Sequence, residues 1–344
     1  GEPGSLSTEG ANFRSGPPRS QDIAIQQNFE TTTVFVRNGF PAFSNTQLLR
    51  GADVFVFPDY RGNLYATQWF LDVQRTLPGD FLLTLGYQGT KSTNLHTVRN
   101  INQPLTPSAT VPANQRLIRP QFNGVNYHEN SLNAIYHAMT LKAEKRFAKG
   151  FTFLGSFTWS KNIDYGNEDL LDGGQGAVTP YDLRRERALS TLNRKFGSAF
   201  SVVYEIPTGP LSGPAKWILG GWQVGGIVSL VSGLPVPHSI NVNNQNLGGA
   251  VRGDWVRNPN LPSGERTIDR WFDTGFVVPA APGTVANAGR NLIIAPGRQN
   301  VDAMVSRVFT MPWEGHRLQF RFESFNFFNK ANFGPPAAGV GTPV

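Results

Sequence analysis

The sequence predicts an all-β fold, an antiparallel transmembrane β-barrel, for most of a chain of 344 residues. Three observations lead to this prediction. Apolar and polar residues alternate with a period of two in eight segments, which is the pattern of a β-strand with two different faces. Short and long connections alternate along the chain. The polar faces carry charges of both signs, which suits the wet lumen of a barrel.

The clearest element is a predicted hairpin from Ala134 to Lys161. Its arms read AIYHAMTLKAEKRF and FTFLGSFTWSK, and each arm gathers its large apolar residues on one face. Only Ala148, Lys149 and Gly150 separate the arms, which fits a tight turn with glycine in the left-handed region. A soluble sandwich would bury the apolar face in a core, whereas a membrane barrel exposes it to lipid. Periodicity alone does not separate these two folds.

The lengths of the connections favour the barrel. The other predicted strands are Asn63–Leu77, Phe81–Gln88, Arg194–Ile206, Gly221–Val231, Val301–Thr310 and His316–Phe327. The connections 78–80, 148–150 and 311–315 are short, whereas 89–133, 162–187 and 232–300 are long and 207–220 is intermediate. Outer-membrane barrels have short periplasmic turns and long external loops, and a sandwich gives no reason for this asymmetry.

The same pattern divides the chain into two parts. Residues 1–62 form a predicted loop-rich segment, in which Gln21–Val36 and Val54–Val56 are candidate strands. Residues 63–344 form the predicted antiparallel barrel portion with its long external loops.

Composition excludes several other classes of protein. No run of about 18 apolar residues is present, so no transmembrane helix is predicted. The start, GEPGSLSTEG, shows no signal peptide, which indicates that a signal was removed or that the chain starts within a longer protein. The absence of cysteine excludes disulfides and thiol chemistry. The net charge of +7 is scattered over the strands and forms no basic stripe, so nucleic acid is not an expected partner.

No motif indicates catalysis, and we expect no enzyme activity, no catalytic residue and no cofactor. The five histidines do not stand at metal-ligand spacing, so no metal site is expected from them. The sequence contains no P-loop, GxSxG or HExxH motif. An acidic stretch from Asp164 to Asp182 leaves two interpretations open, a solvated loop or a calcium site.

The alternation assigns candidate side chains to two faces and a rim. The residues predicted to face the lumen or a substrate are Lys142, Glu144, Arg146, Arg184, Arg185, Arg187, Arg321 and Glu323. The residues predicted to face lipid are Leu83, Leu85, Met139, Leu141, Phe153, Phe157, Val202 and Phe320. Trp69, Trp159 and Trp222 are predicted at the membrane interface, where amphipathic rings are favoured, rather than in a carbohydrate-stacking platform. The three arginines between 184 and 187 fit either a charged rim of the lumen or direct contact with a substrate.

Five stretches of the chain, taken in order, resemble one protein family. They are YATQWFLDVQRTLPGDFLLTLGYQGTKSTNL, AIYHAMTLKAEKRFAKGFTFLGSFTWSKNIDYG, DLRRERALSTLNRKFGSAFSVVYEIPTG, GGWQVGGIVSLVSGLPV and HRLQFRFESFNFFNKANFG. They are similar to the barrel of large TonB-dependent outer-membrane receptors of the Oar-like kind, which carry a carboxypeptidase-regulatory-like N-terminal domain. The resemblance runs from about Tyr65 to Gly334, and the order of the five motifs makes it specific.

The resemblance implies a barrel of about 22 strands whose lumen holds a plug. It also implies a signal peptide, a plug domain and a TonB-contacting segment before the barrel, and a closing strand with a terminal aromatic residue. None of these is seen in this sequence, which stops at GVGTPV. We therefore expect the C-terminal part of a large barrel, a fragment that lacks the plug and the last strand. Its first and last strands, Asn63–Leu77 and His316–Phe327, should then be unpaired edges.

The resemblance implies that the protein takes up a large or scarce solute in the bacterial outer membrane. The expected partners are outer-membrane lipid, an unidentified solute, and the TonB complex acting through a plug domain that is not present in this chain. The alternative is an outer-membrane surface or adhesion protein whose long loops bind a partner without transport. A plug domain encoded upstream would favour the receptor, and its absence would favour the adhesion protein.

Overall fold

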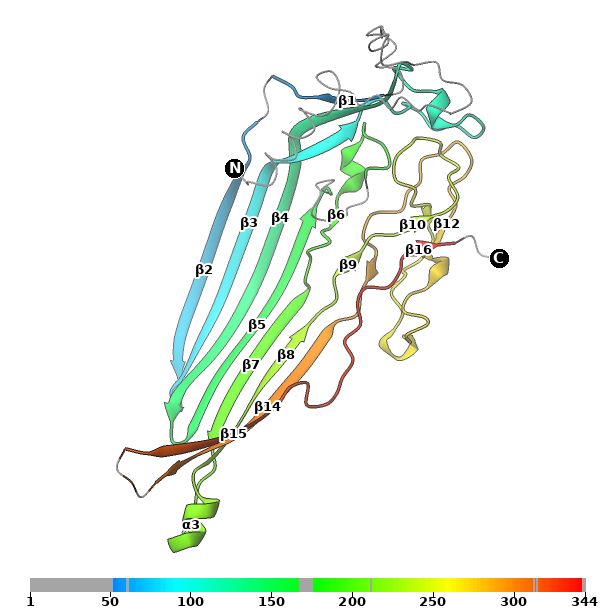
Figure 1. Ribbon diagram of the computed structural model, residues 1–344. Coiled ribbons are helices and arrows are strands. Elements are labelled where there is room, and N and C mark those ends of the chain that lie inside the picture. The colour runs from blue at the N-terminus through cyan, green and yellow to red at the C-terminus, as the bar shows by residue number, and fades with distance from the viewer. Residues whose placement is uncertain are drawn as a thin grey trace, which may run out of the picture.

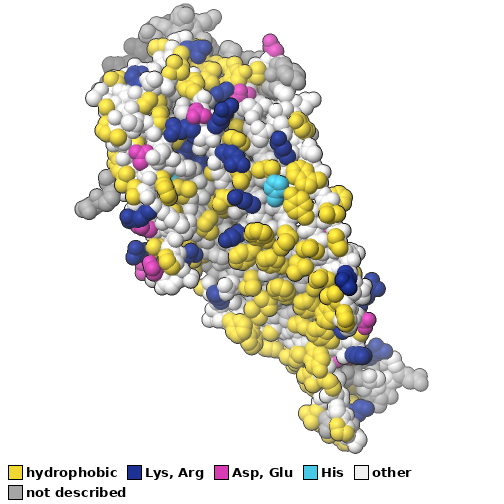
Figure 2. All heavy atoms as spheres, turned by 180° about the vertical axis from the view of Figure 1, so that it is seen from behind, with side chains coloured by type: hydrophobic (Ala, Val, Ile, Leu, Met, Phe, Trp, Pro, Cys, Tyr) yellow, Lys and Arg dark blue, Asp and Glu magenta, His cyan; other side chains and the backbone are white. Residues whose placement is uncertain are grey.

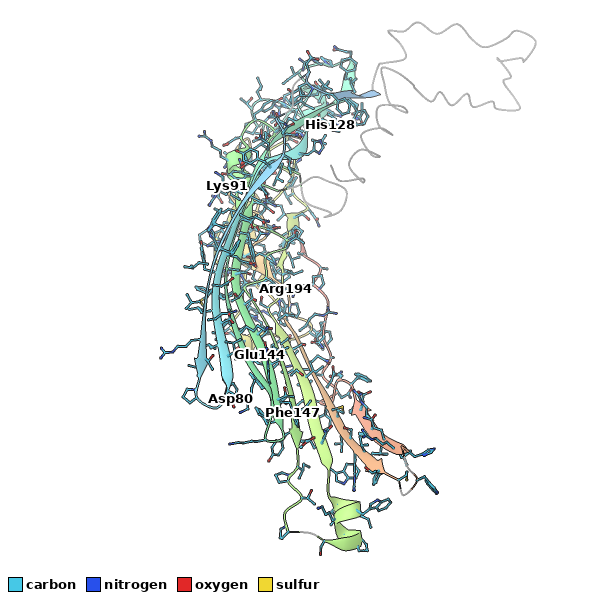
Figure 3. All side chains as sticks on the ribbon, turned by 90° about the vertical axis from the view of Figure 1, so that its left-hand side faces the viewer. Asp80, Lys91, His128, Glu144, Phe147 and Arg194 are labelled. Atoms are coloured by element: carbon cyan, nitrogen blue, oxygen red, sulfur yellow. The ribbon has the colours of Figure 1, made fainter. Side chains whose placement is uncertain are left out.

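The computed structural model describes residues 52–59, 62–166, 176–210, 212–311, 313 and 315–341. Its main feature is one large sheet of long, antiparallel strands, bowed along its length (Figures 1 and 3). The predicted loop 1–20, the candidate strand Gln21–Val36 and the end of the chain after residue 341 lie outside the described residues.

All eight predicted strands are present, which confirms the fold class. They are β2 (Tyr65–Leu77), β3 (Phe81–Asn100), β4 (Phe122–Ala148), β5 (Phe151–Asp164), β7 (Phe196–Glu205), β8 (Trp222–Val231), β14 (Arg298–Thr310) and β15 (Arg317–Ser324). Their order across the sheet is β15-β14-β8-β7-β5-β4-β3-β2. Within the described chain no ladder joins β2 to β15, so the sheet is open and these two strands are its edges, as the sequence predicts.

The short connections all lie at one end of the sheet, which we call the turn end (Figure 1). The hairpin between β4 and β5 turns through Lys149 and Gly150, whose φ angles of 52° and 75° define a two-residue turn of the type that matches strand twist. The intermediate connection 207–220 contains a short helix, α3 (Gly213–Leu219), which the sequence analysis did not predict. Proline in its first turn fixes a helical φ and explains the local structure.

The opposite end, which we call the loop end, corrects the predicted connection 89–133. β3 continues to Asn100 and β4 begins at Phe122, so that only 101–121 connects them, with a 3₁₀ turn at Ala113–Gln115. At about 3.4 Å per residue, the 27 residues of β4 extend roughly 90 Å, far more than the 9–11 residues that cross a bilayer. The short strand predicted at Val54–Val56 is confirmed as β1 (Ala52–Val56), which pairs in parallel with the start of β4.

The long connection 232–300, predicted as a loop, is a small packed unit. It contains β9 (Pro235–Val236), β10 (Ser239–Ile240), β11 (Asp254–Trp255), β12 (Val277–Val278), β13 (Ile293–Ile294) and 3₁₀ turns at Ser263–Glu265 and Thr274–Phe276. Its core is Ile240, Phe272, Phe276, Val277, Ala288, Ile293 and Val340. Val340 belongs to β16 (Gly339–Val340), which pairs with β10, so the predicted loop-like tail returns to the loop end. We call residues 235–294 with 339–340 the loop module.

Two further short elements complete the loop end. A 3₁₀ turn at Leu183–Glu186 leads into β6 (Ala188–Leu189), which pairs with the end of β5. In the part of the chain that the structure describes, no helix has the length and apolar character needed to span a membrane.

Candidate functional site: two faces of the sheet and the loop end

The eight residues predicted to face lipid share one face of the sheet. Strand register sets this, because residues paired across neighbouring strands point to the same side. Leu85 pairs with Leu141, which pairs with Phe157, and the same register continues through the neighbouring strands to Phe320. Leu141 and Phe320 are 37% and 50% exposed. Figure 2 shows this face, with hydrophobic side chains in a broad patch toward the turn end and Lys and Arg gathered above it. That lipid covers the patch remains a prediction.

Aromatic rings lie at both ends of this apolar face. At the loop-end side, Trp69 Nε1 donates to the Tyr87 hydroxyl at 3.4 Å, and the same hydroxyl lies 2.8 Å from His137 Nδ1. Trp159 follows on β5, where it pairs with Met139. At the turn-end side, Trp222 packs edge-on against Phe320 with ring centres 5.9 Å apart. The three tryptophans predicted at the membrane interface thus lie at the two borders of the apolar face.

Basic side chains reinforce the border at the turn end. Lys145 Nζ lies 5.0 Å from the centre of the Phe81 ring and donates to the Gly79 carbonyl at 2.6 Å. Arg307, which is 5% exposed, lies over Phe309 and donates to carbonyls at the end of α3. Long cationic side chains that leave an apolar surface and reach its edge behave in this way at membrane interfaces. From His137 to Lys145, β4 rises about 27 Å, close to the height of a barrel's apolar band.

The opposite face of the sheet is mostly polar and carries paired charges, although Phe70, Leu154 and Ile227 are also exposed on it. Lys142 Nζ lies 3.1 Å from Glu144, and Arg321 lies 2.6 Å from Glu323. Arg146 is exposed at the turn end. Four strands separate β4 from β15, so the structure places these predicted lumen residues on one face but does not gather them into one binding site.

The predicted arginine rim contains a buried carboxylate that the sequence pattern does not reveal. Arg184, Arg185 and Arg187 are exposed, whereas Glu186 is 1% exposed. Glu186 Oε1 accepts from Arg252 at 2.6 Å and from the Val178 amide at 3.0 Å. Buried carboxylates need such partners, but these come from remote parts of the chain, so the local sequence gives no sign of the burial.

A second arginine extends this cluster to the sheet. Arg290 Nε donates to the Glu186 carbonyl at 2.8 Å, and its guanidinium pairs with Asp164 at the end of β5. Two guanidinium groups therefore meet two carboxylates, and the cluster holds the long connection against β5 and the 3₁₀ turn. Asp164, part of the predicted acidic loop, is thereby an ion-pair partner; residues 167–175 of that loop lie outside the described residues.

Two histidine environments occur at the loop end. His238 is fully buried against Phe276, and desolvation, followed by the charge of Arg252, lowers its pKa to about 4. His96 and His128, distant in sequence, approach with ring nitrogens 3.2 Å apart. Among the residues that the structure describes, no three His, Cys, Asp or Glu side chains group in a way that could hold a metal ion.

A cavity of about 970 Å³ opens where the loop end meets the apolar face. It is lined by β5, β7 and β8 on one side and by the loop module and residues 295–299 on the other. The cavity lies next to the apolar patch, on the side toward the loop end, and not in the middle of the polar face.

The outer membrane beta barrel domain family matches residues 3–344. The chain belongs to this family and is a β-barrel protein of the bacterial outer membrane. None of the curated proteins matches the chain.

Two solved structures are similar to parts of the fold. One is the ferripyoverdine receptor of the outer membrane of Pseudomonas aeruginosa bound to ferripyoverdine, with 11% identity and a TM-score of 0.38 over 77% of this chain and 23% of the receptor. The other is the outer membrane transporter YddB from Escherichia coli, with 8% identity and a TM-score of 0.43 over 82% of this chain and 31% of the transporter. The chain therefore spans about a quarter to a third of the length of these proteins.

Proposed function

We propose that this chain forms part of the barrel of a TonB-dependent receptor of the Oar-like kind, which takes up a large or scarce solute across the outer membrane. The observation that carries the proposal is the two-faced sheet. One face is apolar between two aromatic borders, and the other carries charged pairs such as Lys142–Glu144. The five sequence stretches that resemble such receptors cover the same strands.

In such a receptor the two faces of the sheet have different roles. The apolar face contacts lipid, which requires that all backbone polar groups pair within the sheet. The polar face lines the lumen, where charge pairs between neighbouring residues remain hydrated and leave no strong field of one sign. The solute is captured at the loop end, and the TonB complex acts through a plug domain.

The orientation of the faces can be tested by cysteine scanning, because this chain contains no cysteine and any cysteine elsewhere in the full-length protein can first be replaced by serine. Single cysteines are introduced from Met139 to Glu144 in the full-length protein in outer-membrane vesicles. A water-soluble maleimide should label Thr140→Cys and Lys142→Cys and leave Met139→Cys and Leu141→Cys unlabelled. Uniform labelling, or the opposite alternation, would reject the lipid-facing assignment.

A surface or adhesion protein remains the competing function, and the packed loop module favours it because such a unit offers a binding surface. Uptake separates the two. Wild-type cells, cells without this gene and cells without the TonB complex are grown in the same medium. If the protein is a receptor, cells with either deletion should leave in the medium the same solute that wild-type cells remove. Identical depletion of the medium by all three strains would favour adhesion.

A further inference from the structure

The cavity at the loop end lies on the membrane side of the sheet. By register, Trp159, Lys161, Phe196, Leu230 and Gln299 share the face of the apolar patch, whereas Ser160, Val231 and Arg298, near the strand ends, have the opposite register. Trp159, which belongs to the aromatic border, is 55% exposed, and its pairing partner Phe196 is 40% exposed. The cavity therefore begins at the level where the apolar face ends and continues away from the turn end.

The charges in the cavity have one sign. Lys161, Lys195, Arg266 and Arg298 line it, and no carboxylate does. None of the four takes part in an ion pair within the described chain. The cavity differs in this respect from the cluster around Glu186, where guanidinium groups and carboxylates balance. Its charges select for an anionic group and against a cation.

Arg266, the cation that the loop module contributes to the cavity, is held in place by neighbouring residues. Arg266 Nε donates to the Leu261 carbonyl at 2.7 Å, and its guanidinium lies 5.2 Å from the Trp271 ring centre. Its remaining N–H groups are left for a ligand. A planar guanidinium fixed by stacking is well suited to bind phosphate oxygens.

Much of the remaining wall of the cavity is apolar, although Ser160, Asn193, Ser232, Asn260 and Gln299 also line it. Leu189, Val231, Ile294 and Ala295 line it together with the two aromatic rings and Leu230. A purely ionic solute gains nothing from this wall. An amphiphile gains from both halves, because its anionic head meets the cations while its acyl chains follow the apolar face toward the turn end.

We propose that this cavity binds the phosphate-bearing head of an acylated glycolipid of the outer leaflet, with the acyl chains lying along the apolar face. The proposal rests on the proposed function in one respect, that the apolar face meets lipid and the loop end points outward. In Figure 3, Arg194, which precedes the cavity residue Lys195, lies above Asp80 and Phe147 at the turn end and below Lys91. The site would fix the protein's height in the membrane through specific lipid contacts.

The test measures binding of three probes to the full-length protein in detergent: diphosphorylated lipid A, the same lipid without phosphates, and inorganic phosphate. Wild type should bind the diphosphorylated lipid at least about tenfold more tightly than the dephosphorylated lipid, since charge-assisted hydrogen bonds are lost with the phosphates. The double variant Lys161→Gln/Arg266→Gln should lose about tenfold in affinity for the diphosphorylated lipid only. Trp159→Ala should weaken the binding of both lipids and leave the binding of inorganic phosphate unchanged.

The matched control is Lys142→Gln, which removes a cation from β4 on the polar face and should leave lipid binding unchanged. Equal affinity of wild type and the double variant would overturn the proposal. Inorganic phosphate binding as tightly as the diphosphorylated lipid would also overturn it, because the site would then bind a free anion. The maleimide pattern at residues 139–144 keeps the two proposals apart. If Leu141→Cys is not labelled by maleimide but the protein shows no preference for the diphosphorylated lipid, only the cavity proposal is rejected and the proposed function stands.

Discussion

Replacing Leu141 by arginine tests the membrane assignment at the middle of the apolar face. Leu141 is four residues from His137 and four from Lys145, so it lies about 13 Å along the strand from each border. Its neighbours on the same face are Leu85 and Phe157. An arginine on the lipid face at the midplane costs about 2–4 kcal/mol, a cost that falls to about 0–1 kcal/mol near the interfaces. We therefore expect Leu141→Arg to lower the free energy of unfolding by about 2–4 kcal/mol.

The adjacent residue provides the control, because Lys142 points to the opposite face. Lys142→Ala removes a charge pair with Glu144 whose side chains are 52% and 33% exposed, and such pairs contribute about 0–1 kcal/mol. The assay is guanidinium unfolding of the full-length protein in phospholipid vesicles, followed by tryptophan fluorescence. Met139→Arg, closer to the aromatic border, should cost less than Leu141→Arg. Equal costs at 141 and 142, or no dependence on depth, would refute the assignment of the faces.

Three further predictions concern the loop end and the turns. Glu186→Ala leaves Arg252 buried without its carboxylate and should destabilise the loop module by about 3–5 kcal/mol, seen as faster proteolysis of residues 232–297, whereas Glu144→Ala should not change that proteolysis. The pKa of His238 is about 4 in the folded chain and 6.5 in the unfolded chain, so the unfolded chain binds more protons between these two pH values. The stability of the loop module, measured as its resistance to protease, should therefore fall as the pH is lowered from 7 to 4. The variant His238→Gln should show a weaker dependence on pH. Gly150→Val forces a branched residue to a φ of 75° and should cost about 1–2 kcal/mol in the unfolding assay, whereas Gly264→Ala, which has open space around it, should be nearly neutral.

The part of the sheet toward the turn end was predictable because its two faces differ in polarity. In that part Leu141 and Lys142 point to opposite faces, and apolar and polar residues alternate in a similar way along the other predicted strands. Beyond it, the upper parts of β3 and β4 carry mostly polar side chains on both faces, so the alternation disappears although the backbone ladder continues. Residues 89–100 and 122–133 are recognised as strands only from the backbone pairing of β3 with β4, because the sequence shows no period of two there.

The loop end could not be predicted for a different reason. The strands of the loop module are two residues long, too short for any period to show. Its core joins Ile240 to Val340 across a separation of one hundred residues in sequence. The burial of Glu186 depends on Arg252 and Arg290, which lie 66 and 104 residues away. These contacts depend on the three-dimensional arrangement and leave no local pattern.

The extension of β3 and β4 beyond the bilayer has a mechanical consequence. In Figures 1 and 3 the upper part of this hairpin leans across the loop end instead of continuing straight upward. The Tyr181 hydroxyl donates to the Ile101 carbonyl at 2.9 Å and Arg99 donates to the Pro180 carbonyl, so the leaning arm is fastened to the connection after β5. That connection is in turn fastened by Glu186 to the loop module. The connection 101–121, the connection after β5 and the loop module therefore support one another, and displacing any one of them requires breaking hydrogen bonds or ion pairs with another.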